Sequence, residues 1–433
     1  MKKLLTAVLF AASILTPQIF AQSIKATDRP DGFASVNAKS QFGGNPEKSV
    51  TVKTGADLKK YASEGGYVIY IDGMIDITDG KMPKTAFDDN PELGKFISEN
   101  TNGTIKSWSQ WRNSFAKCMN KNTDYAGNGR HKNVDETMDK YFQALYNAWK
   151  PEIMVNVQSN TTIIGLNGNS GLKGASLQLV SVENIAIRNL NLQDAMDPFP
   201  HHEDKDGFNA QYDCINISES SNIWIDHVTF QDTISVGLKN FAHVKLGDGT
   251  DEKWQTTDGF LDMSKNFHNI TISYCHFYNH DKTCLWGSSD SEKLSVERTV
   301  TAHHNYFHNC VQRLPMIRLA NAHLYNNYFD VEGSSAFTSA YAIGARYNSF
   351  INSEKNYFGS GIKYSIQGDS KKPGNVYSNG DKDSSSAGKR TDQYKSSNKP
   401  VFEIPYEYTL DDNKKLNKEL PAKVGAGVLK VDL

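Results

Sequence analysis

The chain has 433 residues, of which 38% are hydrophobic and 22% are charged, so it can form a globular fold with a sizeable core. Its formal net charge is −2. This balance argues against nucleic acid as a partner, because a polyanion would meet no general attraction. An anionic ligand would have to be held by positive charge concentrated at one place.

The first 21 residues, MKKLLTAVLFAASILTPQIFA, combine Lys2 and Lys3 with an apolar run that ends in the small residue Ala21. This pattern is typical of an export signal, and it is too short and too poorly flanked for a membrane span. We expect cleavage after Ala21 and a secreted, soluble monomer without a membrane partner, extracellular or periplasmic. Residues 22–433 are predicted to form a single domain.

Five cysteines remain in the expected mature chain, so at least one is unpaired: Cys118, Cys214, Cys275, Cys284 and Cys310. In a chain of this length they are expected to be small buried hydrophobic residues, with one disulfide at most. Their spacings do not match a zinc site.

The segments before the central region alternate between helical and strand patterns. Residues 56–63, ADLKKYAS, predict a short amphipathic helix that caps the N-terminal end of the fold, just before the strand-like run 67–75. Residues 80–150 contain the helix-like runs WSQWRNSFAKCMN and VDETMDKYFQALYNAW, which predict a partly helical insertion. Residues 370–400 are polar and rich in Ser, Gly, Lys and Asn, and are predicted to form a loop.

The central region contains an internal repeat of nine residues with alternating apolar positions, typical of a strand: 184–192 (NIAIRNLNL), 222–230 (NIWIDHVTF), 269–277 (NITISYCHF), 299–307 (TVTAHHNYF) and 321–329 (NAHLYNNYF). A fixed unit with variable connectors predicts a coiled ladder of strands. A leucine-rich repeat is the alternative, but its LxxLxL spacing is absent. The pattern favours an all-β fold, a parallel β-helix.

Three acidic residues lie near successive repeat units: Asp213 at the start of one turn of the predicted ladder, and Asp258 and Asp262 just before the next. Stacked strands lie roughly 4.8 Å apart, so these carboxylates are expected to meet although they are about 45 positions apart in sequence. Carboxylates that converge repel one another unless a cation joins them, and an oxygen-only set favours calcium over zinc. Solvated turn aspartates are the alternative.

Three basic residues follow the strand units. Lys282 and Arg313 come after the ends of consecutive repeats, and Arg318 follows Arg313 on an apolar segment. No Asp or Glu lies between 310 and 329, so both guanidinium groups are expected to lack a local carboxylate partner. An ordinary surface lysine is the alternative for Lys282.

Other polar pairs are interpreted as structural. Asp226 and His227 are adjacent on a predicted strand, so they are expected to point to opposite faces and not to form a catalytic dyad. The pairs His201–His202 and His303–His304 receive the same interpretation. The acidic residues Glu203, Asp204 and Asp206 could hold additional calcium or form a solvated loop.

Several of these blocks resemble, in order, the signature blocks of the extracellular pectate lyases of polysaccharide lyase family 1: QYD (211–213), WIDHVTF (224–230), TTDGFLD (256–262), HDK (280–282) followed by GSSDS (287–291), VQRLPMIR (311–318) and HLYNNYF (323–329). The likeness extends from about Gly32 to the VGAGVL tail and leaves out 80–150. Ala320 departs from the pattern, because the family usually has Gly there.

The resemblance implies a right-handed, single-stranded parallel β-helix and calcium-dependent cleavage of polygalacturonate by β-elimination. Asp213, Asp258 and Asp262 match the family's calcium ligands. Lys282 and Arg318 match its contacts to substrate carboxylates, and Arg313 matches the residue that abstracts the proton.

Two other readings of these residues stay open. A pectin lyase would act on methyl-esterified substrate without calcium, although the three retained aspartates argue against it. A non-catalytic carbohydrate-binding β-helix would bind polysaccharide without forming an unsaturated product. A hydrolase would need two carboxylates across the scissile bond, and here they are expected to hold the metal.

Overall fold

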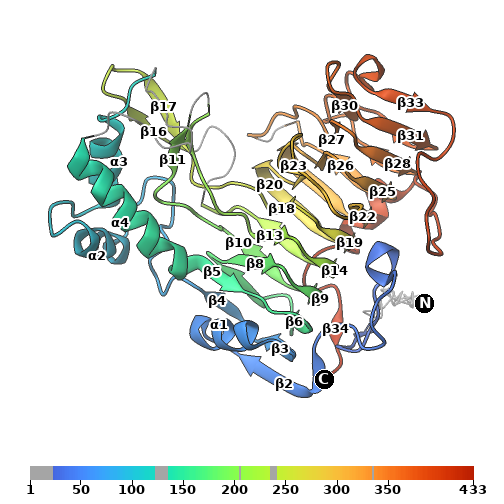
Figure 1. The fold of residues 1–433 in the computed structure, drawn as a ribbon, viewed down its shortest axis with the longest axis horizontal. Helices are drawn as coiled ribbons and strands as arrows, with labels where there is room; N and C mark the ends of the chain where they lie inside the picture. Colours follow the sequence, from blue (N-terminus) through green and yellow to red (C-terminus); the bar gives the residue numbers. More distant parts are fainter. Residues whose placement is uncertain (1–22, 122–134, 204–205, 235–240, 334–335) are drawn as a thin grey trace, which may run out of the picture.

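The computed structural model describes residues 23–121, 135–203, 206–234, 241–333 and 336–433. The predicted export signal, 1–21, lies outside these residues. The chain winds into successive turns whose strands stack on one another in long parallel sheets, which confirms the parallel β-helix (Figure 1). All five cysteines are free, and four of them are buried.

Three parallel sheets form the coil. The first contains β2 (Asn45–Val52), β3 (Tyr67–Ile71), β6 (Thr161–Gly165), β9 (Glu183–Arg188), β14 (Ser221–Asp226), β19 (His268–Ser273), β22 (Thr299–His303), β25 (Asn321–Tyr325), β28 (Phe350–Glu354), β31 (Asn375–Asn379) and β33 (Lys395–Ser397). The second contains β4 (Met74–Asp76), β7 (Gly171–Lys173), β10 (Asn191–Gln193), β15 (Thr229–Gln231), β20 (His276–Lys282), β23 (Tyr306–Gln312), β26 (Tyr328–Asp330), β29 (Tyr357–Phe358) and β32 (Lys382–Asp383). The third contains β5 (Met154–Asn156), β8 (Ser176–Val180), β13 (Ile215–Ser218), β18 (Leu261–Ser264), β21 (Leu285–Trp286), β24 (Met316–Ile317), β27 (Ile343–Ala345) and β30 (Ile366–Gly368).

The observed strand register follows the sequence repeat. Equivalent repeat positions are hydrogen-bonded neighbours, in the order Ile185, Ile223, Ile270, Val300 and Ala322. Each repeat forms two strands and not one, because its sixth residue turns the corner in the left-handed region at φ of 49–53°: Asn189, His227, Tyr274, His304 and Asn326.

The aromatic residue that ends most repeats points into the coil. Phe277 stacks between Phe230 and Phe307, with ring centroids 4.7 and 4.6 Å away, and the column continues to Phe329 and Phe358. These rings are almost wholly buried. The stacking explains why the repeat keeps an aromatic residue at this position where other repeat proteins use leucine.

Helix α1 (Gly55–Glu64) covers the predicted residues 56–63. Its first turn is capped by Thr54, whose hydroxyl accepts a hydrogen bond from the Asp57 amide. Leu58 and Ala62 are buried in the core of the coil. The capping role assigned to this helix remains a prediction.

Three further helices lie between β4 and β5, within the segment predicted as a helical insertion: α2 (Pro91–Asn100), α3 (Trp108–Ala116) and α4 (Glu136–Ile153). Their aromatic residues form a second core, separate from that of the coil. That core also includes Phe208 and Trp254 of a small side sheet composed of β11 (His201–Glu203), β12 (Gly207–Asn209), β16 (Ala242–Lys245) and β17 (Asp251–Trp254). Figure 1 shows helices and side sheet together on one flank of the coil.

The prediction of a loop over 370–400 is wrong, because β31, β32 and β33 add further strands to the coil there. Between 370 and 400 only Val376 and Tyr394 are buried hydrophobic residues. The final turns therefore lack the apolar alternation that identified the earlier ones.

The remaining short elements are η1 (Gly32–Ser35), η2 (Thr391–Gln393), α5 (Leu416–Glu419), η3 (Leu420–Ala422), β1 (Ser23–Ile24) and β34 (Lys430–Val431). The last two pair in parallel and bring the two ends of the described chain together. Within the described residues, no helix combines the length and the apolar character needed to cross a membrane.

Candidate active site

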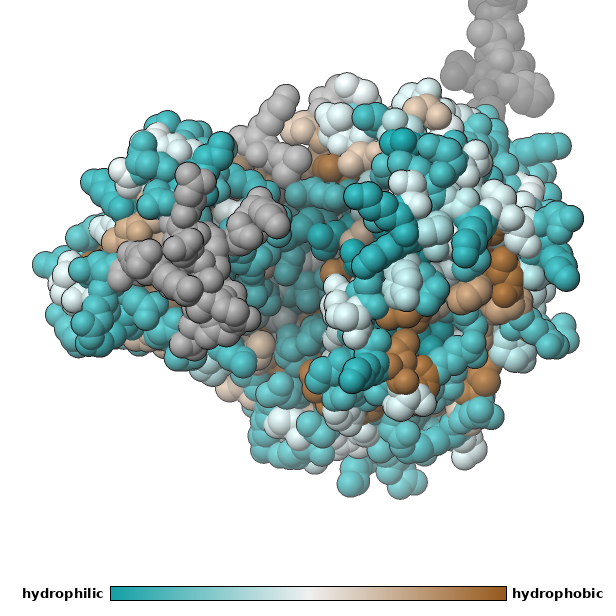
Figure 2. All heavy atoms as spheres, turned by 45° about the horizontal axis from the view of Figure 1, so that its top comes forward, coloured by the Kyte–Doolittle hydropathy of each residue, from teal (hydrophilic) through white to brown (hydrophobic). Residues whose placement is uncertain are grey.

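A polar cleft of about 590 Å³ lies where the side sheet faces the coil. Figure 2 shows hydrophilic surface hollowed between the lobe at the left and the body of the coil. The cleft is lined by Glu203, Asp206, Asn209, Lys253, Gln255, Asp258, Asp262, Asp281, Lys282, Leu285, Ser288, Gln312 and Arg313. Four of the six predicted site residues are among them.

The predicted calcium ligands converge around Gly259. Its amide donates to Oδ1 of Asp213 at 2.8 Å. A methyl group added to Gly259 would lie 2.4 Å from Oδ1 of Asp262 and 2.7 Å from Oδ1 of Asp213, so both carboxylates lie against the same backbone position. Asp213 therefore lies directly behind the cleft wall that Asp258 and Asp262 form.

The proximity of these carboxylates changes how they ionise. Burial raises the pKa of Asp213 well above its usual range, and the negative charges of Asp262 and Asp258 raise it further. Burial likewise raises the pKa of Asp262 to about 7, and Asp258 adds to the shift. The amide of Leu285, which donates to Asp262 at 2.8 Å, opposes the shift.

The donor set fits a hard cation in its chemistry, since it consists of carboxylate oxygens whose mutual repulsion a positive ion would relieve. Across the described parts of the chain, however, no three His, Cys, Asp or Glu side chains already lie close enough together to hold a metal ion. Asp258 pairs with Lys282 at 2.7 Å. A calcium site on the three aspartates would require Asp258 to turn away from that lysine.

Lys282 ends β20 and reaches across the cleft. Besides Asp258, its Nζ donates to Oδ1 of Asn209 on the side sheet at 2.6 Å. Its strand neighbour in the next turn is Gln312, the residue before Arg313. The prediction that Lys282 and Arg313 lie at the same edge of the coil is confirmed by this pairing.

Arg313 follows β23 at a corner of the coil, with φ of 60° in the left-handed region. Non-glycine residues turn other corners of the coil in the same conformation, so the angle belongs to the coil and does not by itself mark a functional residue. In the described part of the chain its guanidinium forms no ion pair with a carboxylate. Its positive charge opposes the rise in the pKa of Asp262, which places the two groups within electrostatic range.

The expectation that Arg318 also lacks a carboxylate partner is wrong. Its Nε lies 3.0 Å from Oδ1 of Asp290, and its Nη1 donates to the carbonyl of Gly287 at 3.2 Å. Both partners come from the turn 287–291, which is distant in sequence but adjacent in the coil. Arg318 is not among the residues that line the cleft.

Comparison with known proteins identifies the protein family to which this chain belongs. The sequence model described as pectate lyase matches residues 131–420. Pectate lyase E of Dickeya chrysanthemi is 31% identical over 374 residues, which make up 85% of this chain and 79% of that protein. The chain belongs to the pectate lyase family. It is therefore a member of a family of polysaccharide-cleaving enzymes.

Solved pectate lyases share its fold. The thermostable pectate lyase PL 47 superposes with a TM-score of 0.73 at 27% identity, covering 92% of this chain and 97% of that one. A second structure, described in terms of substrate specificity and the anti β-elimination mechanism of pectate lyase, has a TM-score of 0.69 at 26% identity, with 93% and 98% covered.

The interpretation of Asp226 and His227 in this pectate lyase family member needs a correction. His227 Nδ1 lies 2.8 Å from Oδ1 of Asp226, so the two side chains do meet. His227 turns the corner after β14 at φ of 51°, and the alternation of a regular strand no longer applies. Asp226 also pairs with Arg188 at 3.0 Å, which agrees with a structural role.

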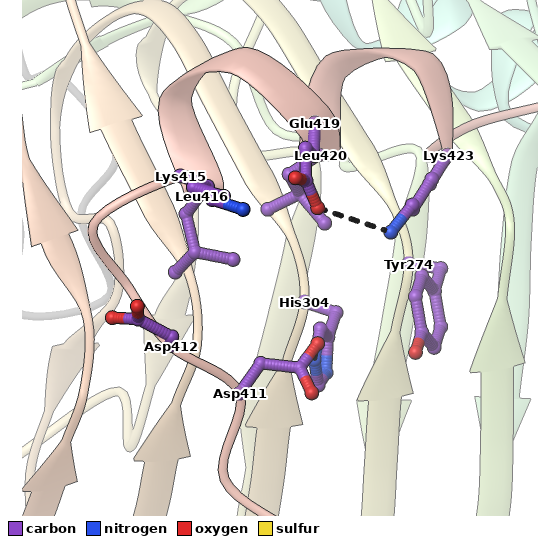
Figure 3. Close-up of a pocket in the computed structure, with 9 residues that line it drawn as sticks. All are labelled: Tyr274, His304, Asp411, Asp412, Lys415, Leu416, Glu419, Leu420 and Lys423. Atoms are coloured by element: carbon purple, nitrogen blue, oxygen red, sulfur yellow. Dashed lines mark hydrogen bonds and ion pairs between the residues drawn. The ribbon is translucent and has the colours of Figure 1, made fainter.

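A separate pocket of about 300 Å³ lies under the C-terminal segment (Figure 3). The Tyr274 and His304 rings stack with centroids 4.8 Å apart, and His304 pairs with Asp411 at 3.2 Å. Glu419 and Lys423 pair with each other at 3.7 Å across its rim. This pocket contains none of the six predicted site residues, so the pectate lyase chemistry is better assigned to the cleft.

The sequence did not identify several polar residues around the cleft, among them Asn209, Lys253 and Asp290. Asn209 and Lys253 come from the side sheet, which carries none of the repeat. Each of these two residues directly neighbours a buried aromatic residue, Phe208 or Trp254, and this neighbouring position was the available signal. Glu203 and Asp206 also line the cleft, whereas Asp204 lies outside the described residues.

Proposed function

We propose that this protein is a secreted, calcium-dependent pectate lyase that cleaves (1→4)-α-D-galacturonan by β-elimination, with Arg313 as the base. The observation that carries the proposal is the position of Arg313, which pairs with no carboxylate of the described residues, beside the converging group of Asp213, Asp258 and Asp262. This arrangement of a guanidinium beside three carboxylates suits a substrate that carries a carboxylate of its own.

The charges of the cleft support the need for a cation. Five carboxylates and three basic groups line it, which leaves a formal charge of −2. A polyuronate entering this cleft would meet net repulsion unless positive charge were added. Calcium held by Asp213, Asp258 and Asp262 would neutralise a uronate carboxylate and so stabilise negative charge that develops beside it.

The basic residues have distinct roles in the elimination. Arg313 would accept the proton from C5 of a uronate. The electrons of the C5–H bond would form the C4–C5 double bond while the bond from C4 to the glycosidic oxygen breaks, and that oxygen would gain a proton from solvent. Lys282, placed 2.7 Å from Asp258, would turn to the substrate carboxylate and stabilise its developing charge.

Arg318 would bind a second uronate carboxylate as its guanidinium exchanges Asp290 for substrate. The Arg318 and Asp290 side chains are 21% and 29% exposed, so their ion pair is partly open to solvent. Breaking such a pair costs little, because water can solvate the released Asp290 carboxylate. The family relationship supports an elimination reaction, since a related structure is described by its anti β-elimination mechanism.

Product analysis on polygalacturonate tests the proposal. We expect oligogalacturonides with a C4–C5 double bond, seen as a rise in ultraviolet absorbance and as fragments lighter than hydrolysis products by one water. Products that have gained water would indicate a hydrolase. Binding without any product would indicate a carbohydrate-binding protein, and cleavage only of methyl-esterified substrate without calcium would indicate a pectin lyase.

A further inference from the structure

Lys253 on β17 has the same unusual environment as Arg313. Its Nζ donates to the neutral amide oxygen of Gln255 at 2.7 Å and lies 5.9 Å from the ring centroid of Phe241. Among the described residues it forms no ion pair. The charges of Asp281, Asp206 and Glu252 act on this ammonium group, but it is half-buried and pairs with none of these carboxylates among the described residues, so its position favours an anionic ligand.

The alternation of the side sheet explains how this lysine reaches the cleft. Trp254 is fully buried in the aromatic core shared with α3 and α4, and its ring lies 4.4 Å from that of Phe208 on β12. Successive residues of a strand point to opposite faces. Lys253 and Asn209, which neighbour these aromatic residues, therefore face the cleft, and both line it.

The electrostatic surroundings connect Lys253 with the proposed catalytic group. Burial lowers the pKa of Lys253, Asp281 opposes this shift, and the positive charge of Lys282 adds to it. Asn209 links the two walls of the cleft, because it accepts a hydrogen bond from Lys282. The side sheet thus presents a cation to the same cleft from the wall opposite the coil.

We infer that Lys253 binds a uronate carboxylate of the polysaccharide next to the unit that reacts, and that the helices between β4 and β5 serve to hold this lysine in place through Phe208 and Trp254. The inference rests on the proposed function. It makes the side sheet a specificity-determining wall, and it predicts a preference for substrate that is not esterified at that position.

Steady-state kinetics of Lys253→Ala in the full chain, with calcium and polygalacturonate, tests the inference. We expect KM to rise about tenfold, as for a lost charge-assisted hydrogen bond, with little change in kcat because the contact is made equally before and during the reaction. Lys253→Arg, which keeps the positive charge, should bring KM most of the way back to the native value. Lys245→Ala is the matched control, since Lys245 lies on the same side sheet but pairs with Asp251 at the exposed surface.

Partial methyl esterification of the substrate should shrink the ratio of KM between Lys253→Ala and the native protein, because an ester offers no charge to Lys253. A purely structural role would change the melting temperature and leave this ratio constant. Lys253→Gln, which keeps the aliphatic stem, serves as the second variant if alanine destabilises the fold. An unchanged KM in folded Lys253→Ala and Lys253→Gln overturns the inference.

Failure of the proposed function gives a different result. In that case the native protein forms no unsaturated product, and affinity for trigalacturonate is compared by calorimetry instead. Weaker binding by Lys253→Ala than by Lys245→Ala would still support the carboxylate contact, and equal binding would overturn it.

Discussion

The Nζ of Lys282 lies 2.7 Å from Oδ1 of Asp258, so a residue expected to bind substrate is paired with a residue expected to bind calcium. The pair is partly buried, with 11% and 24% of the two side chains exposed. A cation bound by Asp258 would therefore release Lys282 for the substrate. Calcium and substrate binding are expected to be coupled through this contact.

Replacing Arg313 with lysine tests the base directly. Arg313→Lys keeps the positive charge but shortens the reach and changes the geometry, so kcat should fall about 10³-fold or more while calcium affinity stays the same. Arg29→Lys is the control, because Arg29 donates to Lys39 and Ser40 carbonyls outside the cleft. Unchanged turnover in Arg313→Lys would remove Arg313 from the mechanism.

The dependence of rate on pH should reveal the same base. A guanidinium group must be neutral before it can accept a proton. We therefore expect kcat to increase into the alkaline range. A profile that stays flat from about pH 6 to about pH 10 would contradict the role of Arg313.

Gly259 gives a test of the aspartate group in which none of the three aspartates is itself replaced. In Gly259→Ala the new methyl would lie 2.4 Å from Asp262 and 2.7 Å from Asp213, so both carboxylates must move. Calcium affinity, measured by calorimetry, should fall about tenfold or more, as for other changes that disturb ligand orientation. Gly333→Ala, whose methyl meets no atom within 4 Å, is the matched control. Equal affinity in the two variants would place the calcium elsewhere.

Asp226 should make the fold sensitive to acid. Burial opposes its ionisation, but His227 and Arg188 outweigh this effect and lower its pKa to about 2. A carboxyl with a lowered folded-state pKa stabilises the protein above its unfolded value of about 4, and the contribution is lost as the pH falls toward 2. The loss should be about 2 kcal/mol of unfolding free energy.

Chemical unfolding at several pH values checks this contribution. The difference in unfolding free energy between native protein and Asp226→Asn should shrink as the pH falls from about 5 to about 2. Asp72→Asn, which removes an exposed partner of Lys53, is the control. A constant difference between native protein and Asp226→Asn would show that this ionisation is not coupled to folding.

The repeat predicted the coil well, because buried apolar positions and strand register are set by the same alternation. The repeat aligns Ile185, Ile223 and Ile270, and these residues are hydrogen-bonded neighbours in the structure. The final turns were missed because they bury so few side chains. The left-handed corners could not be predicted, because His227 and Tyr274 stand there and not the glycine that usually indicates this conformation.

The candidate site was predictable only where it lies on the coil. Asp258, Asp262, Lys282 and Arg313 come from segments next to the repeat units and line one cleft. The partner of Arg318 and the opposite wall come from segments whose placement depends on tertiary packing. Asp290 and Lys253 lie outside the repeat units, so the sequence does not indicate which residues they contact. Their contacts appear only in the folded structure.

The central claim is that a cation held by Asp213, Asp258 and Asp262 enables elimination by Arg313. It is tested most directly by following unsaturated product from polygalacturonate after a chelator has stripped the protein, and then as calcium is added back. The account predicts loss of product formation in chelator and full recovery with calcium, with Asp213→Asn needing more calcium than the native protein. Undiminished product formation in excess chelator would contradict it.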